Sequence, residues 1–240
     1  MVNNNTKGNE NVYELSLVIP FYNEESNVKK VVQEIVDNFN LNKINYEIIA
    51  VDNGSTDGTR KIIKGLNKSN PRIKLSIVRK NIGYGNGIIS GINQANGNFI
   101  GYHWGDGQVP SKYITEVFNK IKEGDYHLGK ITRIYREYSL TRKIASNFYN
   151  TFFPLLFGVN SKDINGCPKI MKGSLLKNLE LESKDWFIDA EIMIKAKRNK
   201  FKLVEVPAEY KKRTGGKSKV RSNVILEFLR NMIRFKLKGY

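Results

Sequence analysis

The sequence predicts one α/β fold, with a mostly parallel central sheet flanked by helices. Short apolar runs alternate with helical patterns through the first half of the 240-residue chain. The strand-like runs are continuously apolar, as in parallel strands that are covered on both faces. A polar, Gly-rich turn at 52–59 follows the second strand, at the sheet edge where open α/β folds bind ligands.

The elements follow in βαβ order, which predicts right-handed crossovers and a site along the carboxyl edge of the sheet. In the first half we expect strands at 15–19, 46–51, 73–78 and 98–102, and helices at 24–38, 59–67 and 85–94. The second half is less regular, with helices expected at 113–122, 142–156, 174–179 and 188–200, and a strand at 202–206.

Composition is that of an ordinary globular protein. Residues 1–12 are Asn-rich and lack an apolar core, so we expect a disordered start rather than a signal peptide. The run at 148–159 is too short and too interrupted to cross a bilayer, which favours a buried or interfacial helix. The single cysteine, Cys167, excludes an intrachain disulfide and fits a reducing compartment. We expect a cytoplasmic protein, or a peripheral one on the cytosolic face of a membrane.

The positive charge is concentrated late in the chain. Of the net +17, residues 195–240 carry fifteen Lys or Arg and three Glu, a local charge of +12. Such a patch suits phosphate groups on anionic lipid, on a phosphorylated substrate or on nucleic acid, or is simply a solvated surface. Nucleic acid is the weakest reading, because it rests on charge alone.

The last twenty residues, 221–240, predict a basic amphipathic helix. We expect it to pack on the domain core, and the alternative is a position in a membrane interface. Its polar face holds Asn223, Glu227, Arg230, Asn231, Arg234 and Lys238, and its apolar face holds Ile225, Phe228, Leu229 and Met232.

Three strand ends carry residues suited to ligand chemistry. Asp52 ends the second strand and is expected to contact a ligand, while Asp57 is expected to cap the following helix. Pro20, Tyr22 and Glu24 end the first strand beside Asp52, where they would frame a base and ribose; Pro20 could equally serve only to end the strand.

A third strand runs into Asp106 and Gln108. Because alternate residues of an extended segment share a face, both could direct oxygen atoms at one Mg²⁺ or Mn²⁺, with diphosphate oxygens and water completing the shell. His103 lies just upstream, and a lone histidine beside a strand is more often structural.

These strand ends resemble the GT-A glycosyltransferases of the inverting family 2, and the second half resembles the dolichol-phosphate mannose synthase and polyprenyl-phosphate glycosyltransferase branch. The resemblance runs from Tyr13 onward. It rests on the segments 18–24, 52–59, 81–85, 95–98, 163–166, 189–191, 205–207 and 213–219.

The resemblance implies a GT-A (Rossmann-like) domain over 13–220, with a nucleotide-sugar half at 13–110 and an acceptor half at 111–220. It implies these roles: nucleoside contacts by Pro20, Tyr22, Glu24 and Asp52; metal and diphosphate contacts by Asp106 and Gln108; phosphate contacts by Arg213 and Lys219; acceptor-phosphate contacts by Arg133 and Arg142. The alternative is a purely structural role: the arginines would be solvated surface charges, and Asp189 would cap a helix or form an ion pair.

Three positions depart from the family pattern. Trp104 stands where the first of two flanking acids is usual, and Asn53 stands for the second acid of a pair. A basic residue usual after a later glycine is replaced within the run Cys167-Pro168-Lys169.

The expected activity is inverting transfer of a hexose from a GDP- or UDP-sugar to a polyprenyl phosphate, with a membrane surface and a membrane-anchoring subunit as candidate partners. A phosphate monoester is already ionised and needs no strong base. The alternatives are transfer to a glycan or protein hydroxyl, for which Asp189 would be the base, and a non-catalytic nucleotide-sugar-binding protein.

Overall fold

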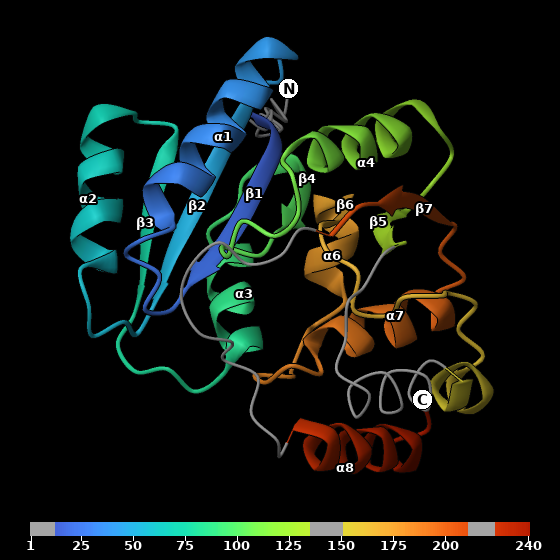
Figure 1. Ribbon diagram of the computed structural model, residues 1–240. Coiled ribbons are helices and arrows are strands. Elements are labelled where there is room, and N and C mark those ends of the chain that lie inside the picture. The colour runs from blue at the N-terminus through green and yellow to red at the C-terminus, as the bar shows by residue number, and fades with distance from the viewer. Residues whose placement is uncertain (1–12, 135–150, 211–223) are drawn as a thin grey trace, which may run out of the picture.

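The computed structural model describes residues 13–134, 151–210 and 224–240. Helices cover both faces of one seven-stranded sheet (Figure 1), as the alternating sequence pattern predicted. The strands are β1 Tyr13–Phe21, β2 Tyr46–Asn53, β3 Ile73–Val78, β4 Gly97–Tyr102, β5 Leu128–Arg133, β6 Lys169–Lys172 and β7 Leu203–Ala208. The helices are α1 Val28–Leu41, α2 Thr59–Ser69, α3 Tyr84–Ile92, α4 Lys112–Glu123, α6 Gly173–Asn178, α7 Ile188–Arg198 and α8 Val224–Leu237.

The sheet is mostly parallel and has the order β3-β2-β1-β4-β6-β5-β7. Strand β1 pairs in parallel with β2 and β4, β2 pairs in parallel with β3, and β5 pairs in parallel with β7. Only β6 runs antiparallel to its neighbours, β4 and β5, among the described strands. The carboxyl ends of β1, β2 and β4 therefore meet at one edge, with β1 between the other two.

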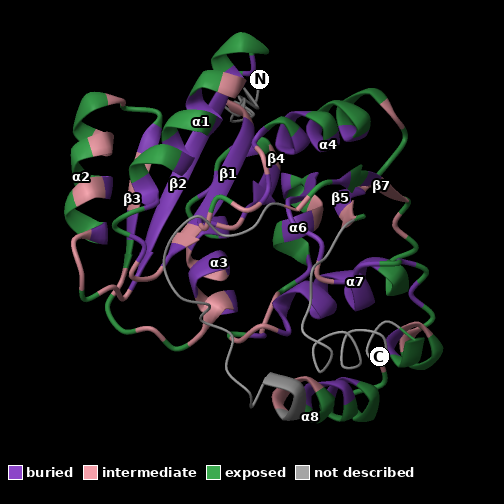
Figure 2. Ribbon diagram, viewed as in Figure 1, coloured by how far each residue is buried: buried purple, intermediate pink, exposed green. Residues whose placement is uncertain are grey.

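Two hydrophobic layers hold the sheet, one on each face (Figure 2). Alternate β1 residues Leu15, Leu17 and Ile19 pack with α1, α2 and α4. Val18 faces the other layer, which contains residues of α3, α6, α7 and α8. All eight residues of β2 are buried, as expected of a parallel strand with both faces covered.

Helix α8 docks on the core, as predicted, and Phe228 and Met232 of the predicted apolar face do face the core. Met232 and Phe235 are buried, whereas Leu229, expected on the apolar inner face, is 37% exposed. Ile233 and Leu237 extend the same exposed stripe, at 62% and 84%. Phe228, Met232 and Phe235, spaced by four and three, form the docked stripe, while Leu229, Ile233 and Leu237, spaced by four, form the exposed stripe beside it.

Several element boundaries differ from the predicted ones. Helix α1 begins at Val28 rather than at residue 24, because residues 24–27 form a turn in which the Asn27 and Val28 N–H groups both donate to the Glu24 carbonyl. Strands β5 and β6 were not predicted, and each contains a buried lysine, Lys130 or Lys169. Of the helix predicted at 142–156, residues 142–150 lie outside the described residues, and 151–157 are helical. None of the helices in the described ranges is long and apolar enough to span a bilayer.

Candidate active site

The carboxyl ends of β1 and β2 carry two turns that are bonded to each other. Phe21 and Asp52 are register partners at the two strand ends. The Asn23 N–H donates to Ser55 Oγ at 3.1 Å, and the Thr56 N–H donates to Asn23 Oδ1 at 2.8 Å. Two turns that the sequence predicted to lie side by side therefore form one bonded unit.

Asp52 is fully buried at this edge and is held by two groups of its own turn and helix. Its Oδ1 accepts from the Ser55 N–H at 2.9 Å, and its Oδ2 accepts from Arg60 Nε at 2.5 Å. Arg60 is 45% exposed, so the ion pair joins a buried carboxylate to a solvated guanidinium. Arg60 was missed by sequence reasoning, although its position as the second residue of the following helix is a usable signal.

The other predicted nucleoside contacts lie on the same rim. Glu24 is 7% exposed, accepts from Asn27 Nδ2 at 2.6 Å and donates its N–H to Thr59 Oγ1 at 2.9 Å. Pro20 and Tyr22 are half-buried on either side of Phe21. The structure thus brings all four predicted nucleoside contacts to neighbouring strand ends, with both carboxylates engaged in shaping the turns.

Asp57 lies one position before the N-cap of α2 rather than at the N-cap itself, yet its side chain still accepts from the helix start. It precedes the N-cap residue Gly58, and its Oδ1 accepts from the N–H of Thr59, the first residue of the helix, at 3.0 Å. Its Oδ2 accepts from the Glu25 N–H at 3.2 Å. The Glu25 carboxylate in turn accepts from the Gly58 N–H at 2.7 Å, so each acid satisfies a backbone donor near the helix start.

Asp106 and Gln108 lie together, but on a turn rather than on the extended segment that the sequence suggested. Strand β4 ends at Tyr102, and Gly107 adopts a φ of 71°, in the left-handed region that glycine tolerates. The Gln108 N–H donates to Asp106 Oδ1 at 3.1 Å. Gln108 Oε1 accepts from the Tyr210 hydroxyl at 2.7 Å. The turn brings both side chains to the sheet edge beside β1.

The oxygen atoms of this turn fit a divalent cation in type. Carboxylate and carboxamide oxygens are the hard ligands that Mg²⁺ and Mn²⁺ prefer. Within the part of the chain that the structure describes, no three His, Cys, Asp or Glu side chains gather closely enough to hold a metal. A cation here would therefore rely on Asp106, Gln108, a bound phosphate group and water.

Trp104, which stands at the position of the usual first acid, is part of an aromatic cluster around Arg133. Its ring meets Tyr210 edge-on, with centroids 6.0 Å apart. The Arg133 guanidinium lies 5.0 Å from the Trp104 centroid and 5.4 Å from that of Tyr210. Arg133 Nε and Nη2 also donate to the two Asp163 oxygens at 2.7 and 2.8 Å. Arg133, a predicted acceptor contact, is thus held rigidly beside the Asp106 and Gln108 turn.

His103 is a buried structural residue, as the residue pattern favoured. The residue is 1% exposed, and Nε2 lies 3.3 Å from the carbonyl oxygen of Val109. Burial disfavours the imidazolium and lowers the pKa of His103 to about 4. The ring is therefore neutral at pH 7 and bridges the two ends of the turn that contains Asp106.

The pKa of His103 predicts an acid-sensitive fold. Between the ordinary pKa of 6.5 and the folded pKa of about 4, the unfolded chain binds a proton that the folded chain does not. The contribution of the neutral His103 ring to the free energy of unfolding is therefore fully present above pH 6.5. About 3 kcal/mol of it is lost as the pH falls toward 4. We expect the free energy of unfolding, measured with urea, to fall less between pH 7 and pH 4.5 in His103→Gln than in the wild type. An equal fall in the variant and the wild type would contradict this prediction.

Asp189 lies in the first turn of α7, and its carboxylate is buried in an ion pair. Its Oδ1 accepts from the Tyr102 hydroxyl at 2.7 Å and from Lys169 Nζ. The side chains of Asp189 and Lys169 are 4% and 1% exposed. Burial also raises the pKa of Tyr84 and of Cys167, which lie close to this carboxylate. Asp189 thus forms an ion pair, one of the two structural roles that the sequence left open. The sequence did not identify Lys169 as its partner.

Three predicted site residues, Arg142, Arg213 and Lys219, lie outside the described residues. The others form two groups along the carboxyl edge. Pro20, Tyr22, Glu24 and Asp52 lie at the ends of β1 and β2, and Asp106, Gln108, Arg133 and Asp189 lie around the ends of β4 and β5 and the start of α7.

Comparisons with known proteins identify the family and the fold. The family described as Glycosyl transferase family 2 matches residues 16–179, which is more than half of the chain. The chain is 37% identical to an uncharacterized glycosyltransferase of Synechocystis sp. over 124 residues, which cover 52% of this chain and 39% of that protein. It is 30% identical to a dolichol-phosphate mannosyltransferase of Pyrococcus furiosus over 230 residues, 92% of this chain and 63% of that protein.

A solved structure shares the fold. It is glucosyl-3-phosphoglycerate synthase from Mycobacterium tuberculosis, in complex with Mn²⁺, uridine diphosphate and glucosyl-3-phosphoglycerate. The TM-score is 0.65 at 17% identity, covering 92% of this chain and 76% of that one, so the likeness is one of fold. The chain spans less than two thirds of the length of the two curated relatives named above. The match over residues 16–179, on a GT-A sheet, shows that the chain belongs to glycosyl transferase family 2.

Proposed function

We propose that this chain transfers a hexose from a GDP- or UDP-sugar to a polyprenyl phosphate, with inversion at the anomeric carbon. The observation that carries the proposal is the turn of Asp106 and Gln108 at the carboxyl edge, beside the bonded turns of β1 and β2. It joins oxygen ligands for a metal-bound diphosphate to a rim suited to a nucleoside. The mannosyltransferase relative supports the lipid-phosphate branch.

The donor half is proposed to hold the nucleotide sugar. Pro20, Tyr22, Glu24 and Asp52 would contact the nucleoside, while Asp106 and Gln108 would hold Mg²⁺ or Mn²⁺, which when bound neutralises charge on the diphosphate. Arg213 and Lys219 would donate to the phosphate oxygens and stabilise the departing nucleoside diphosphate.

The acceptor is proposed to be a phosphate monoester because Asp189 is poorly suited to serve as a general base. Its carboxylate is buried and already accepts from Lys169 and Tyr102. An ionised phosphate oxygen can attack C1 directly, forming the new C1–O bond as the bond to the diphosphate breaks. Arg133 and Arg142 are the proposed contacts of the acceptor phosphate.

The exposed stripe of α8 supports a position at the cytosolic face of a membrane, peripheral and with or without an anchoring subunit. Leu229, Ile233 and Leu237 lie on this stripe. The helical segment 151–157 contributes Leu155, 76% exposed, and it is tied to α8 because Lys236 Nζ donates to the Leu156 carbonyl at 2.9 Å. Basic residues beside such apolar side chains favour anionic lipid surfaces.

Replacing the stripe tests this position. We expect the triple change Leu229→Ser, Ile233→Ser and Leu237→Ser to reduce co-sedimentation with phosphatidylglycerol vesicles at least tenfold, because apolar area is lost from the interface. Leu41→Ser, at an 82% exposed position on α1, is the matched control and should sediment as the wild type does. Equal sedimentation of the triple variant would remove the membrane part of the proposal.

The activity itself is tested with three donors, GDP-mannose, UDP-glucose and UDP-N-acetylglucosamine, with and without Mn²⁺. Each is offered with a short polyprenyl phosphate and, separately, with an oligosaccharide, and products are identified by mass spectrometry. Metal-dependent transfer to the lipid phosphate is expected. Sugar found only on a hydroxyl acceptor would overturn the lipid reading, and donor binding with no transfer to either acceptor would favour a binding protein.

A further inference from the structure

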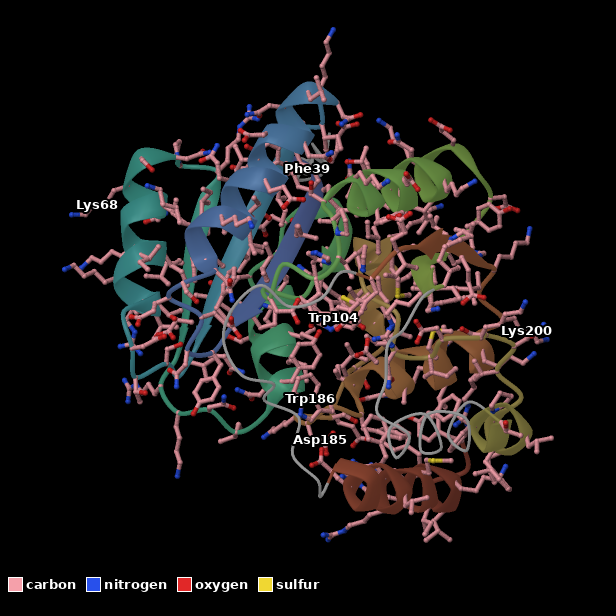
Figure 3. All side chains as sticks on the ribbon, viewed as in Figure 1. Phe39, Lys68, Trp104, Asp185, Trp186 and Lys200 are labelled. Atoms are coloured by element: carbon pink, nitrogen blue, oxygen red, sulfur yellow. The ribbon has the colours of Figure 1, made fainter. Side chains whose placement is uncertain are left out.

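Trp104 occupies a position where an acid would face the donor, and its surroundings give it a different task. The residue is half-buried and packs against both hydrophobic layers. In Figure 3 it lies near the middle of the view, where the two halves of the sheet meet. Trp104 therefore belongs to a junction between β4, β5 and the end of β7.

A chain of contacts crosses this junction and ends on Gln108. Asp163 fixes the Arg133 guanidinium through two hydrogen bonds, and the Asp163 and Arg133 side chains are 3% and 10% exposed. The guanidinium lies over the rings of Trp104 and Tyr210. The Tyr210 hydroxyl then donates to Gln108 Oε1 at 2.7 Å.

We propose that Tyr210 is a positioning residue that orients the Gln108 carboxamide for the diphosphate of the donor, and that Trp104 and Arg133 hold the Tyr210 ring in place. The inference rests on the proposed nucleotide-sugar site. Cation–π contacts from one guanidinium to two rings fix both ring planes, which a single hydrogen bond to the hydroxyl could not do.

Tyr210 lies two residues past the end of β7. The contact between Tyr210 and Gln108 thus joins the segment after β7 to the turn of Asp106. Donor affinity should depend on this hydroxyl even though Tyr210 itself need not touch the nucleotide.

An acid at position 104 would act against this arrangement. Aspartate lacks the ring face that contacts Arg133, and its charge would compete with Asp163 for the guanidinium. Trp104→Asp is therefore expected to weaken nucleotide binding. If position 104 were instead a degraded metal ligand, the same change would strengthen Mn²⁺-dependent binding, so one variant separates the two explanations.

The test measures binding of GDP and UDP in the presence of Mn²⁺ by calorimetry, with the intact chain. Tyr210→Phe is expected to weaken binding of the preferred nucleotide roughly five- to tenfold, the worth of one hydrogen bond. Gln108→Ala should remove most of this dependence, so that the double variant binds no more weakly than Gln108→Ala alone. Tyr126→Phe, at an exposed tyrosine after α4, is the matched control.

A second readout follows Trp104 itself. The chain has two tryptophans, so Trp186→Phe leaves Trp104 as the only one, and its fluorescence should change when nucleotide and Mn²⁺ bind. Wild-type affinity in Tyr210→Phe would overturn the positioning role while leaving the donor site standing. Absence of nucleotide binding by the wild type would overturn the donor site and the positioning role together.

Discussion

Asp106→Asn is expected to reduce kcat/KM for sugar transfer roughly 100- to 1000-fold. The change keeps the size of the side chain and an oxygen that can accept from the Gln108 N–H, as Asp106 Oδ1 does at 3.1 Å. It removes the negative charge that a divalent cation needs most at this turn, where the only other proposed protein ligand is the neutral Gln108. Losing a cation that stabilises a departing diphosphate costs several kcal/mol, and each 1.36 kcal/mol is a factor of ten in rate.

The measurement pairs initial rates with Mn²⁺ titrations of nucleotide binding. Asp37→Asn is the matched control, because Asp37 is exposed on α1, where its Oδ1 accepts from Gln33 Nε2 at 2.8 Å. The control should keep both rate and metal dependence. If Asp106→Asn retained the wild-type metal response, the cation would have to lie elsewhere and the proposed donor geometry would be wrong.

Strands that form from continuous apolar sequence were predicted closely. Strand β3 has the predicted bounds, and the predicted strand at 46–51 forms the start of β2, which continues through Asp52 and Asn53. Local composition suffices here: β2 is buried along its whole length, and β3, at the edge of the sheet, has an apolar sequence although it is only partly buried. Strands β5 and β6 could not be found in the same way, because each contains a buried lysine. Lys130 and Lys169 form ion pairs with Glu205 and Asp189, which are distant in the sequence.

The same limit separates the site residues that were predicted from those that were missed. Asp52, Asp106 and Gln108 follow strand ends, a signal that depends only on neighbouring sequence. Tyr210 was missed because its partner Gln108 lies 102 residues away. Lys169, twenty residues from Asp189, was missed for the same reason. Long-range pairing decides which charged side chains form ion pairs. The sequence therefore identified Asp189 as a candidate but not its ion-pair partner.

Asp189→Asn is expected to lower the free energy of unfolding by about 3–5 kcal/mol. The change keeps the shape of the side chain but leaves the Lys169 ammonium, which is 1% exposed, without its counter-charge. Breaking a buried ion pair from one side costs this much because an uncompensated charge stays in the interior. Urea unfolding at pH 7 measures the loss. Asp125→Asn, which removes an exposed partner of Lys202, is the control and should unfold with the wild type.

A compensating variant separates the structural role of Asp189 from a chemical one. Asp189→Asn combined with Lys169→Met removes both charges, so most of the lost stability should return. If the acceptor is a phosphate, the double variant should also recover transfer, because the attacking oxygen is already ionised and no base is removed. A double variant that is stable, binds donor and still fails to transfer would make the Asp189 carboxylate a participant in the reaction, and a hydroxyl acceptor would then be favoured.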